Sequence, residues 1–368
     1  MSFSLADLRL SNAMVLLGLD GEIPKHECVP ETYKALCADF LGYIAEQLSV
    51  LAAHPDQSGA EADKVANDHH EQTKDEWLGY IERLNRCVLG YRENTQVKTA
   101  VKRFTENLIT PMLSAGECWR RSYTKPLGYP GDYQIMNYAY DFEPLGDALP
   151  AKYLHLVGVT SGRLILSRMD SLVEMLTAHA VERPENERFK VISIGSGPAR
   201  EIESLARAVN QESGRRLDAV LVDSEPAAIA YAEKLLSPLS EKIGFDFDTM
   251  NVSIRDIVSE RYSDAIYRNV NVIYSSGLFD YLGPRTARRY VEKLYAALEP
   301  GGRVIIGNVN DKPTGAIWVM EYATDWGLYF RNDQEMLAMA EGLADAKVTL
   351  TEDANESVYF LVVEKPVH

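Results

Sequence analysis

The chain has 368 residues, of which 46% are hydrophobic and 25% are charged, and its formal net charge is −16. These are ordinary values for a folded protein, and the length allows two domains. The excess of acidic residues disfavours a nucleic-acid partner, because phosphate binding depends on Lys and Arg.

The N-terminal twenty residues, MSFSLADLRLSNAMVLLGLD, have no basic leader, and Asp and Arg interrupt their apolar run. No segment is expected to reach the length of a membrane-spanning helix. Four cysteines lie far apart without a CxxC pair, which favours reduced thiols over a disulfide framework or a zinc site. We therefore expect a cytoplasmic protein without stable membrane insertion, and leave a homodimer open.

Residues up to about 180 are predicted to be helical. Apolar residues at helical spacing indicate helices over 30–51, 77–88 and 97–108. The polar stretch 54–73 between the first two is expected to be a surface loop. Residues 153–181 are expected to form one long or broken helix.

The segment 125–142, KPLGYPGDYQIMNYAYDF, contains four tyrosines, two glycines and two prolines. Its Pro and Gly residues are expected to break any helix, so we predict a stiffened loop. A tyrosine ring presents an apolar face and one hydroxyl. The rings would therefore either line a binding site or hold two domains together.

The pattern changes near residue 185, where short apolar runs begin to alternate with helical segments. This alternation predicts a doubly wound parallel sheet. The last two strands, near 346–353 and 357–365, are separated by a few polar residues and predict an antiparallel hairpin. We therefore predict two domains: a helical cap over 1–180 and an α/β domain over 181–368.

The run VISIGSGPAREIE places Gly195 and Gly197 between a predicted strand and a helix. Such a turn lets the backbone approach a ligand, and the helix N-terminus offers free N–H groups. Arg200 stands where the dinucleotide fingerprint has its third glycine, which weakens a pyrophosphate site. Asp223 ends the next predicted strand, where a carboxylate can accept both hydroxyls of a ribose. A purely structural turn is the competing interpretation.

Residues 185–365 resemble the class I S-adenosylmethionine-dependent methyltransferases in the runs VISIGSGPAREI, LVDSEPAAIAYA and LEPGGRVIIGNV. The resemblance implies that S-adenosyl-L-methionine is the cofactor. It also implies that the glycine turn contacts methionine, the acid contacts ribose, the segment after the third strand frames adenine, and the end of the fourth strand faces the methyl group. The implied cofactor-binding residues are Gly195, Ser196, Gly197, Pro198, Asp223, Ser224, Asn251, Val252, Ser253, Tyr274, Ser275 and Gly277.

A narrower resemblance involves KPLGYPGDYQIMNY, SGLFDYL and MEYATDWGLYFR. These runs are similar to a bacterial methyltransferase subfamily with a helical N-terminal domain, which includes enzymes of 3-hydroxypalmitic acid methyl ester biosynthesis. The resemblance implies methylation of a carboxylate oxygen of a hydroxy fatty acid or a similar metabolite. N-methylation of an amine or guanidinium metabolite, such as an amino acid, is the alternative. An NAD-dependent oxidoreductase and a non-catalytic binding module are further alternatives.

We expect the segment 125–142 to act as a lid over the cofactor and the acceptor, since methyl transfer needs alignment and exclusion of water. The catalytic candidates are Tyr133, Asp132 and Glu321. The acceptor-binding candidates are Tyr129, Asn137, Tyr138, Asn308, Tyr322, Trp326 and Arg331.

The charge of the acceptor is left open by the sequence. Glu321 and Asp325 are four residues apart, so we expect them on one helix face, where they would bind a cation or act as a base. Arg331, together with Arg120 and Arg121, would instead bind a carboxylate. No metal is expected, because the pair His69–His70 has no third ligand nearby in the sequence.

Overall fold

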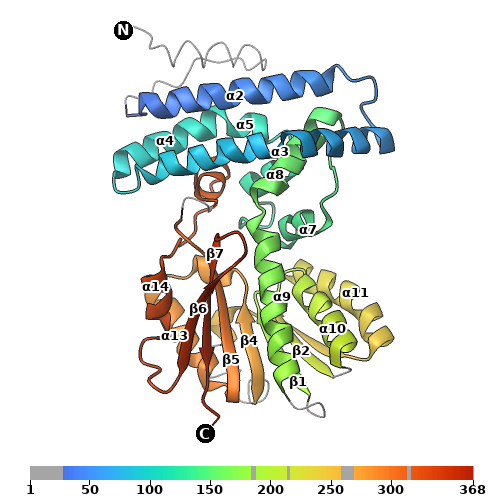
Figure 1. Cartoon of the computed structure of the whole chain (residues 1–368), viewed down its shortest axis with the longest axis vertical. Helices are drawn as coiled ribbons and strands as arrows, with labels where there is room; N and C mark the ends of the chain where they lie inside the picture. Colours follow the sequence, from blue (N-terminus) through green and yellow to red (C-terminus); the bar gives the residue numbers. More distant parts are fainter. Residues whose placement is uncertain (1–27, 184–187, 214–215, 258–268, 313–315, 368) are drawn as a thin grey trace. The chain divides into compact units, whose positions relative to one another are not determined.

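The computed structural model describes residues 28–183, 188–213, 216–257, 269–312 and 316–367 (Figure 1). The chain divides into two compact units. The first extends to Arg163 and also contains Ala316–Gly327, and the second comprises Leu164–Gly315 and Leu328–His368. Residues 164–180, expected in the helical domain, thus fall in the second unit, and 316–327 fall in the first.

From residue 28 on, the described part of the first unit consists of helices and the turns that join them. Its elements are α2 (Glu31–Ala52), α3 (Gly59–Leu89), α4 (Thr95–Leu108), α5 (Thr110–Leu113), α6 (Glu117–Thr124), α7 (Tyr133–Asp141), α8 (Leu149–Ser161) and the π-helix η2 (Trp318–Ala323). Phe40 of α2 lies at the centre, with its ring 5.1 Å from that of Trp77 and 5.9 Å from that of Trp318. These aromatic contacts join three elements from distant parts of the sequence into one core.

Hydrogen bonds explain why η2, which follows β5 in the sequence, belongs to the first unit. The backbone N–H of Trp318 donates to Asn85 Oδ1 over 2.7 Å, and its indole N–H donates to the Tyr33 hydroxyl over 2.7 Å. The Thr110 hydroxyl donates to the Ala323 carbonyl over 2.7 Å. All of these atoms belong to buried residues, so each bond satisfies a group that would otherwise lose hydration.

The expected surface loop over 54–73 is wrong for most of its length, because α3 already begins at Gly59. Ala62, Ala66 and His70 form its buried face, at every fourth position. His70 Nε2 lies 2.7 Å from the Thr160 hydroxyl of α8. Small alanines and a histidine do not give the apolar stripe by which a helix is usually recognised.

Helix α2 is long and apolar enough to cross a membrane by length and composition alone, with a mean hydropathy of 1.3 over its best eighteen residues. The expectation that no segment reaches that length was therefore wrong. In the structure Tyr33, Phe40 and Ile44 of this helix are fully buried within the first unit. A core helix passes the same test, so a single such helix is weak evidence for a membrane span.

The second unit is built on a sheet of seven strands in the order β3-β2-β1-β4-β5-β7-β6 (Figure 1). The strands are β1 (Phe189–Ile194), β2 (Leu217–Asp223), β3 (Asp246–Asn251), β4 (Val270–Ser275), β5 (Leu298–Val309), β6 (Lys347–Glu352) and β7 (Val358–Glu364). The first five pair in parallel, and β7 runs antiparallel to both β5 and β6. The predicted architecture, a doubly wound sheet that ends in an antiparallel hairpin and is preceded by helices, is confirmed.

Helices cover both faces of this sheet (Figure 1). One side carries α9 (Leu164–Glu182), α10 (Arg200–Ser213) and α11 (Pro226–Ile243), and the other carries α13 (Pro284–Ala296) and α14 (Asp333–Leu337). Short elements complete the unit: α12 (Ile254–Ile257), η1 (Leu278–Tyr281) and η3 (Ala338–Ala340). After β1 the chain passes through α10 to β2, and after β4 it passes through α13 to β5. The strand order therefore reverses between β1 and β4, where ligands bind in sheets of this class.

The hydrogen bond from Trp318 gives a first prediction. Tyr33→Phe removes the hydroxyl that accepts from the Trp318 indole and lies 2.6 Å from the Thr105 hydroxyl. Because the indole N–H then stays buried without an acceptor, we expect the free energy of unfolding to fall by about 1–3 kcal/mol. Urea denaturation of the full chain measures this change, with Tyr123→Phe, an exposed tyrosine, as the control. Equal stability of the two variants would show that the bond contributes nothing.

Candidate functional site

The turn between β1 and α10 has the backbone that its glycines allow. Gly195 and Gly197 have φ values of +68° and +50°, in the left-handed region that glycine adopts without steric cost. A Cβ atom at Gly195 would lie 3.2 Å from Leu278 Cβ, whereas one at Gly197 would meet no atom within 4 Å. The N–H groups of Gly195 and Ser196 both donate to the Val222 carbonyl, which fixes the turn to the end of β2.

Asp223 ends β2 as predicted, and its carboxylate joins two loops. One oxygen accepts from the Gly197 N–H over 2.8 Å, and the other accepts from the Glu225 N–H over 2.9 Å. Burial raises the pKa of Asp223, although these N–H groups favour its charged form. A carboxylate has about four acceptor positions, so the pair of bonds orients it without exhausting its capacity.

The residues expected to frame adenine lie at the same edge of the sheet. Asn251 is the last residue of β3, and its side-chain amide donates to the Asp223 carbonyl over 3.0 Å. The Ser253 hydroxyl donates to Asp256 Oδ2 over 2.7 Å at the start of α12. Val252 lies between them, half-buried against the core. The structure thus brings this segment beside Asp223, and its role toward adenine stays a prediction.

Buried hydroxyls gather at the ends of β1 and β4. Ser196, Ser275 and Ser276 are all less than 8% exposed, and their hydroxyls have no hydrogen-bond partner among the described residues. Buried polar groups are normally satisfied, so three such hydroxyls at the end of the sheet fit a polar ligand there. Ser276 was not singled out in the sequence, although it directly follows the predicted residue Ser275.

Two of the acceptor-binding candidates have their polar groups occupied within the second unit. Asn308 donates to the Val309 and Tyr329 carbonyls and accepts from Arg331. The Arg331 guanidinium also donates to the carbonyls of η1 and the residue after it, Phe279 and Leu282. Both side chains are at most 3% exposed. We therefore assign them to the support of the η1 segment rather than to the acceptor.

The segment 125–142 is not a loop throughout, because its second half forms α7. The Pro130–Gly131 pair precedes the helix and does not interrupt it. Asp132 is the N-cap of α7: its Oδ1 accepts from the Gln134 and Ile135 N–H groups over 3.0 and 3.1 Å. The Arg121 guanidinium contacts both oxygens of the same carboxylate at 2.9–3.0 Å. Asp132 is 1% exposed, and this structural role corrects its expected place in a loop.

The other candidates of this segment differ in what they contact. The Tyr138 hydroxyl donates to Glu117 Oε1 over 3.3 Å, and burial raises the pKa of this tyrosine to about 12. Asn137 is 1% exposed, and neither polar atom of its amide has a hydrogen-bond partner in the described part of the chain. Tyr129 and Tyr133 are half-buried. Asn137 is thus the candidate here whose polar group is buried and available.

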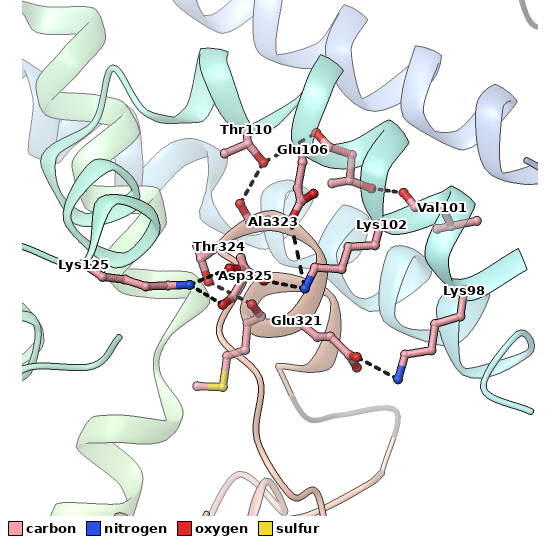
Figure 2. A network of polar contacts seen from close by, with 12 residues as sticks. Lys98, Val101, Lys102, Glu106, Thr110, Lys125, Glu321, Ala323, Thr324 and Asp325 are labelled. Atoms are coloured by element: carbon pink, nitrogen blue, oxygen red, sulfur yellow. Dashed lines mark hydrogen bonds and ion pairs between the residues drawn. The ribbon is translucent and has the colours of Figure 1, made fainter. Parts of the chain in front are cut away.

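The carboxylates after β5 are paired with lysines (Figure 2). Lys98 Nζ lies 2.7 Å from Glu321 Oε1, and Lys125 Nζ lies 2.6 Å from Asp325 Oδ2. Lys102 pairs with the other oxygen of Asp325. Burial acts to raise the pKa of Asp325, but the hydrogen bonds from both lysines hold it below its usual value.

The prediction that Glu321 and Asp325 lie on one face of a helix is wrong. The segment forms the π-helix η2, which ends at Ala323, and Asp325 lies beyond it with φ +51°. In a π-helix the hydrogen bonds join residues five apart instead of four. Residues four apart therefore no longer lie one above the other on the same face, as they do in an α-helix. Glu321 and Asp325 therefore have separate lysine partners and do not form one acidic site.

The two aromatic candidates of this segment are packed inside the first unit. Tyr322 is 2% exposed, and burial raises its pKa. Trp326 lies against Gly131, where an added Cβ atom would come within 2.0 Å of the indole ring. Gly131 also has φ +69°, so both space and backbone require glycine beside this tryptophan.

The capping of α7 gives a second prediction. Asp132→Asn keeps an oxygen that can cap the helix but removes the charge that pairs with Arg121. We expect the free energy of unfolding to fall by about 1.5–3 kcal/mol, the contribution of a hydrogen bond to a charged group. Chemical denaturation measures it, with Tyr123→Phe, an exposed tyrosine, as the control. If Asp132→Asn is as stable as the native chain but turns over slowly, the residue has a catalytic role instead.

No family model matches the sequence, and a comparison with curated proteins finds no match. Solved structures are similar to it. A structure described as a possible exported protein from Bordetella parapertussis is 15% identical, covers 80% of this chain and 97% of its own, and superimposes with a TM-score of 0.53. At this identity the likeness concerns the fold alone.

Two similar structures come from Burkholderia thailandensis. One is a 1,6-didemethyltoxoflavin-N1-methyltransferase with bound S-adenosylhomocysteine, at 19% identity, 56% and 82% coverage of this chain and its own, and a TM-score of 0.38. The other is an O-methyltransferase family protein at 14% identity, 74% coverage of both chains and a TM-score of 0.43. Because both TM-scores lie below 0.5, we draw nothing about function from them.

Proposed function

We propose that this protein is an S-adenosylmethionine-dependent methyltransferase that acts on a small-molecule acceptor. The observation that carries the proposal is the Asp223 carboxylate at the end of β2, hydrogen-bonded to the Gly197 N–H of the glycine turn. This pair stands next to the point where the strand order of the sheet reverses. Gly195 and Gly197 have left-handed backbone angles, and the Gly197 N–H is hydrogen-bonded to an acid. An ordinary strand-to-helix connection needs neither feature.

The residues at this edge fit the cofactor. Gly195 and Gly197 have no side chains that would keep a ligand from the backbone of the turn, and Asp223 retains acceptor capacity for ribose hydroxyls. The hydroxyls of Ser196, Ser275 and Ser276 are available to polar groups of the same ligand. When bound, S-adenosylmethionine supplies a methyl group on a sulfonium centre. The work left to the protein is to position the acceptor and to exclude water.

For the acceptor we propose the carboxylate oxygen of a hydroxy fatty acid or a similar metabolite, which is the reaction that the subfamily resemblance implies. The charged candidates do not decide the question. Asp132 pairs with Arg121, and Glu321 pairs with Lys98. Asp325 pairs with both Lys102 and Lys125. These acids therefore give no surplus negative charge for a cationic acceptor. A screen of fatty acids, amino acids and amines with isotopically labelled cofactor separates O- from N-methylation.

The cofactor assignment gives a third prediction. Asp223→Ala removes charge-assisted hydrogen bonds worth about 1.5–3 kcal/mol each, so S-adenosylhomocysteine should bind at least about tenfold more weakly. Isothermal titration calorimetry measures the affinity. Asp248→Asn, an exposed acid on the neighbouring strand β3, is the control and should bind as the native chain does.

Two results would count against the proposal. One is unchanged affinity for S-adenosylhomocysteine in a folded Asp223→Ala protein. The other is binding of NAD, and not of S-adenosylhomocysteine, by the native chain, which would favour the oxidoreductase alternative.

A further inference from the structure

Helices α9 and α10 lie next to each other on one face of the sheet, and a groove of about 460 Å³ runs between them (Figure 1). The α10 wall of this groove consists of Ser204 and Ala208, whose small side chains let an occupant come close to the helix. None of the residues that line the groove belongs to the strand ends where the cofactor is proposed to bind. The groove is therefore a separate feature of the second unit.

Two acids of α9 line the groove, and neither has a cation beside it. Asp170 and Glu174 are both exposed, and no basic side chain pairs with either of them in the part of the chain that the structure describes. By contrast, the Glu203 carboxylate on α10 lies 2.9 Å from Arg207 and 3.7 Å from Arg200. The α9 side of the groove thus carries two uncompensated negative charges, four residues apart on one helix face.

The Thr177 hydroxyl is a third polar group in the α9 wall, one turn beyond Glu174. Thr177 is 9% exposed, and its hydroxyl has no hydrogen-bond partner among the described residues. A helical threonine can donate to the carbonyl four residues earlier, as four others in this chain do: Thr73, Thr99, Thr105 and Thr124. Because buried polar groups are normally paired, the unsatisfied hydroxyl of Thr177 fits a polar ligand in the groove.

Apolar side chains limit what this ligand can be. Met169 and Val173 line the groove beside the acids, so an occupant needs an apolar part as well as positive charge. A bare divalent cation does not fit, since two carboxylates supply fewer ligands than such an ion takes, and the described residues contain no cluster of three or more metal-binding side chains. The volume is that of a small-molecule site, whereas a stable protein partner would cover roughly 800 Å² of this chain.

We propose that the groove between α9 and α10 binds an aliphatic diamine, with one ammonium group at Asp170 and the other at Glu174. The methylene chain would lie against Met169 and Val173, and the Thr177 hydroxyl would accept from the ammonium group at Glu174. Ammonium groups donate charge-assisted hydrogen bonds to carboxylates. A chain of about four carbons spans roughly the 5–6 Å between the Cβ atoms of helical residues four apart. This inference does not depend on the proposed function.

NMR of the full chain, with carbon-13 in its methionine methyl groups, tests the proposal locally because Met169 lines the groove. Met169→Leu assigns the resonance. 1,4-Diaminobutane should shift it saturably, while the resonance of Met112, which is buried in the first unit, should not move. n-Butylamine has the same chain but one ammonium group, so it should bind about 2- to 5-fold more weakly. 1,4-Butanediol, which has no charge, should cause no shift.

Matched variants assign the contacts. Asp170→Asn combined with Glu174→Gln should weaken 1,4-diaminobutane by about 3- to 30-fold. Glu241→Gln combined with Asp248→Asn removes two exposed acids elsewhere in the same unit and should leave the affinity unchanged. Thr177→Val should weaken binding by about 2- to 10-fold without lowering the melting temperature, since the hydroxyl has no partner in the protein to lose.

Three results would overturn the inference. The first is a Met169 resonance that does not respond to 1,4-diaminobutane. The second is an equal loss of affinity in both double variants, which would indicate diffuse attraction of the amine to an acidic protein. The third is a shift with a pentalysine peptide but none with the diamine, which would assign the groove to a basic protein segment. The comparison of diamine with monoamine uses the native chain, so it stays decisive even if a variant does not fold.

Discussion

The arrangement of the second unit depends on the short pairing between β1 and β4. They pair in parallel only over Val191–Ser193 and Val272–Tyr274, after which their chains leave toward helices on opposite faces of the sheet. Backbone turns and polar side chains of both chains therefore meet at these strand ends. The left-handed glycines, the Asp223 carboxylate and the buried hydroxyls all lie at this edge. The strand order thus fixes where a ligand can bind before any particular side chain is considered.

In the first unit, charge is used to hold the structure together. Two lysines of α4 and Lys125, which directly follows α6, pair with the carboxylates of Glu321 and Asp325 (Figure 2). Arg121 pairs with Asp132, the N-cap of α7. Together with the buried bonds of Trp318 and Thr110, these contacts make 316–327 part of the helical unit. Acidic and basic residues near an expected acceptor segment are therefore poor guides to the charge of the acceptor, because their partners lie within the protein.

Much of the fold could be predicted from the sequence, because the strands are short apolar runs bounded by turns. Strand β2 and the final hairpin lie where they were expected. The beginning of α3 was not predicted because its buried face consists of small residues and a histidine. Helix α7 was not predicted because the Pro and Gly residues before it indicate a loop, although Asp132 is a good N-cap residue. The contacts of Asn308 and Arg331 join positions more than twenty residues apart, and Arg168 meets Gly277 across more than a hundred. No local pattern predicts such pairs.

The central claim, that the edge formed by β1, β2 and β4 binds S-adenosylmethionine, is tested most directly by hydrogen exchange. Backbone amides of the full chain would be followed by mass spectrometry with and without saturating S-adenosylhomocysteine. The account predicts slower exchange in the segments 195–202, 223–227 and 275–280, with β6 and β7 unchanged. Exchange that is unaffected in these three segments, while the compound demonstrably binds, would contradict it.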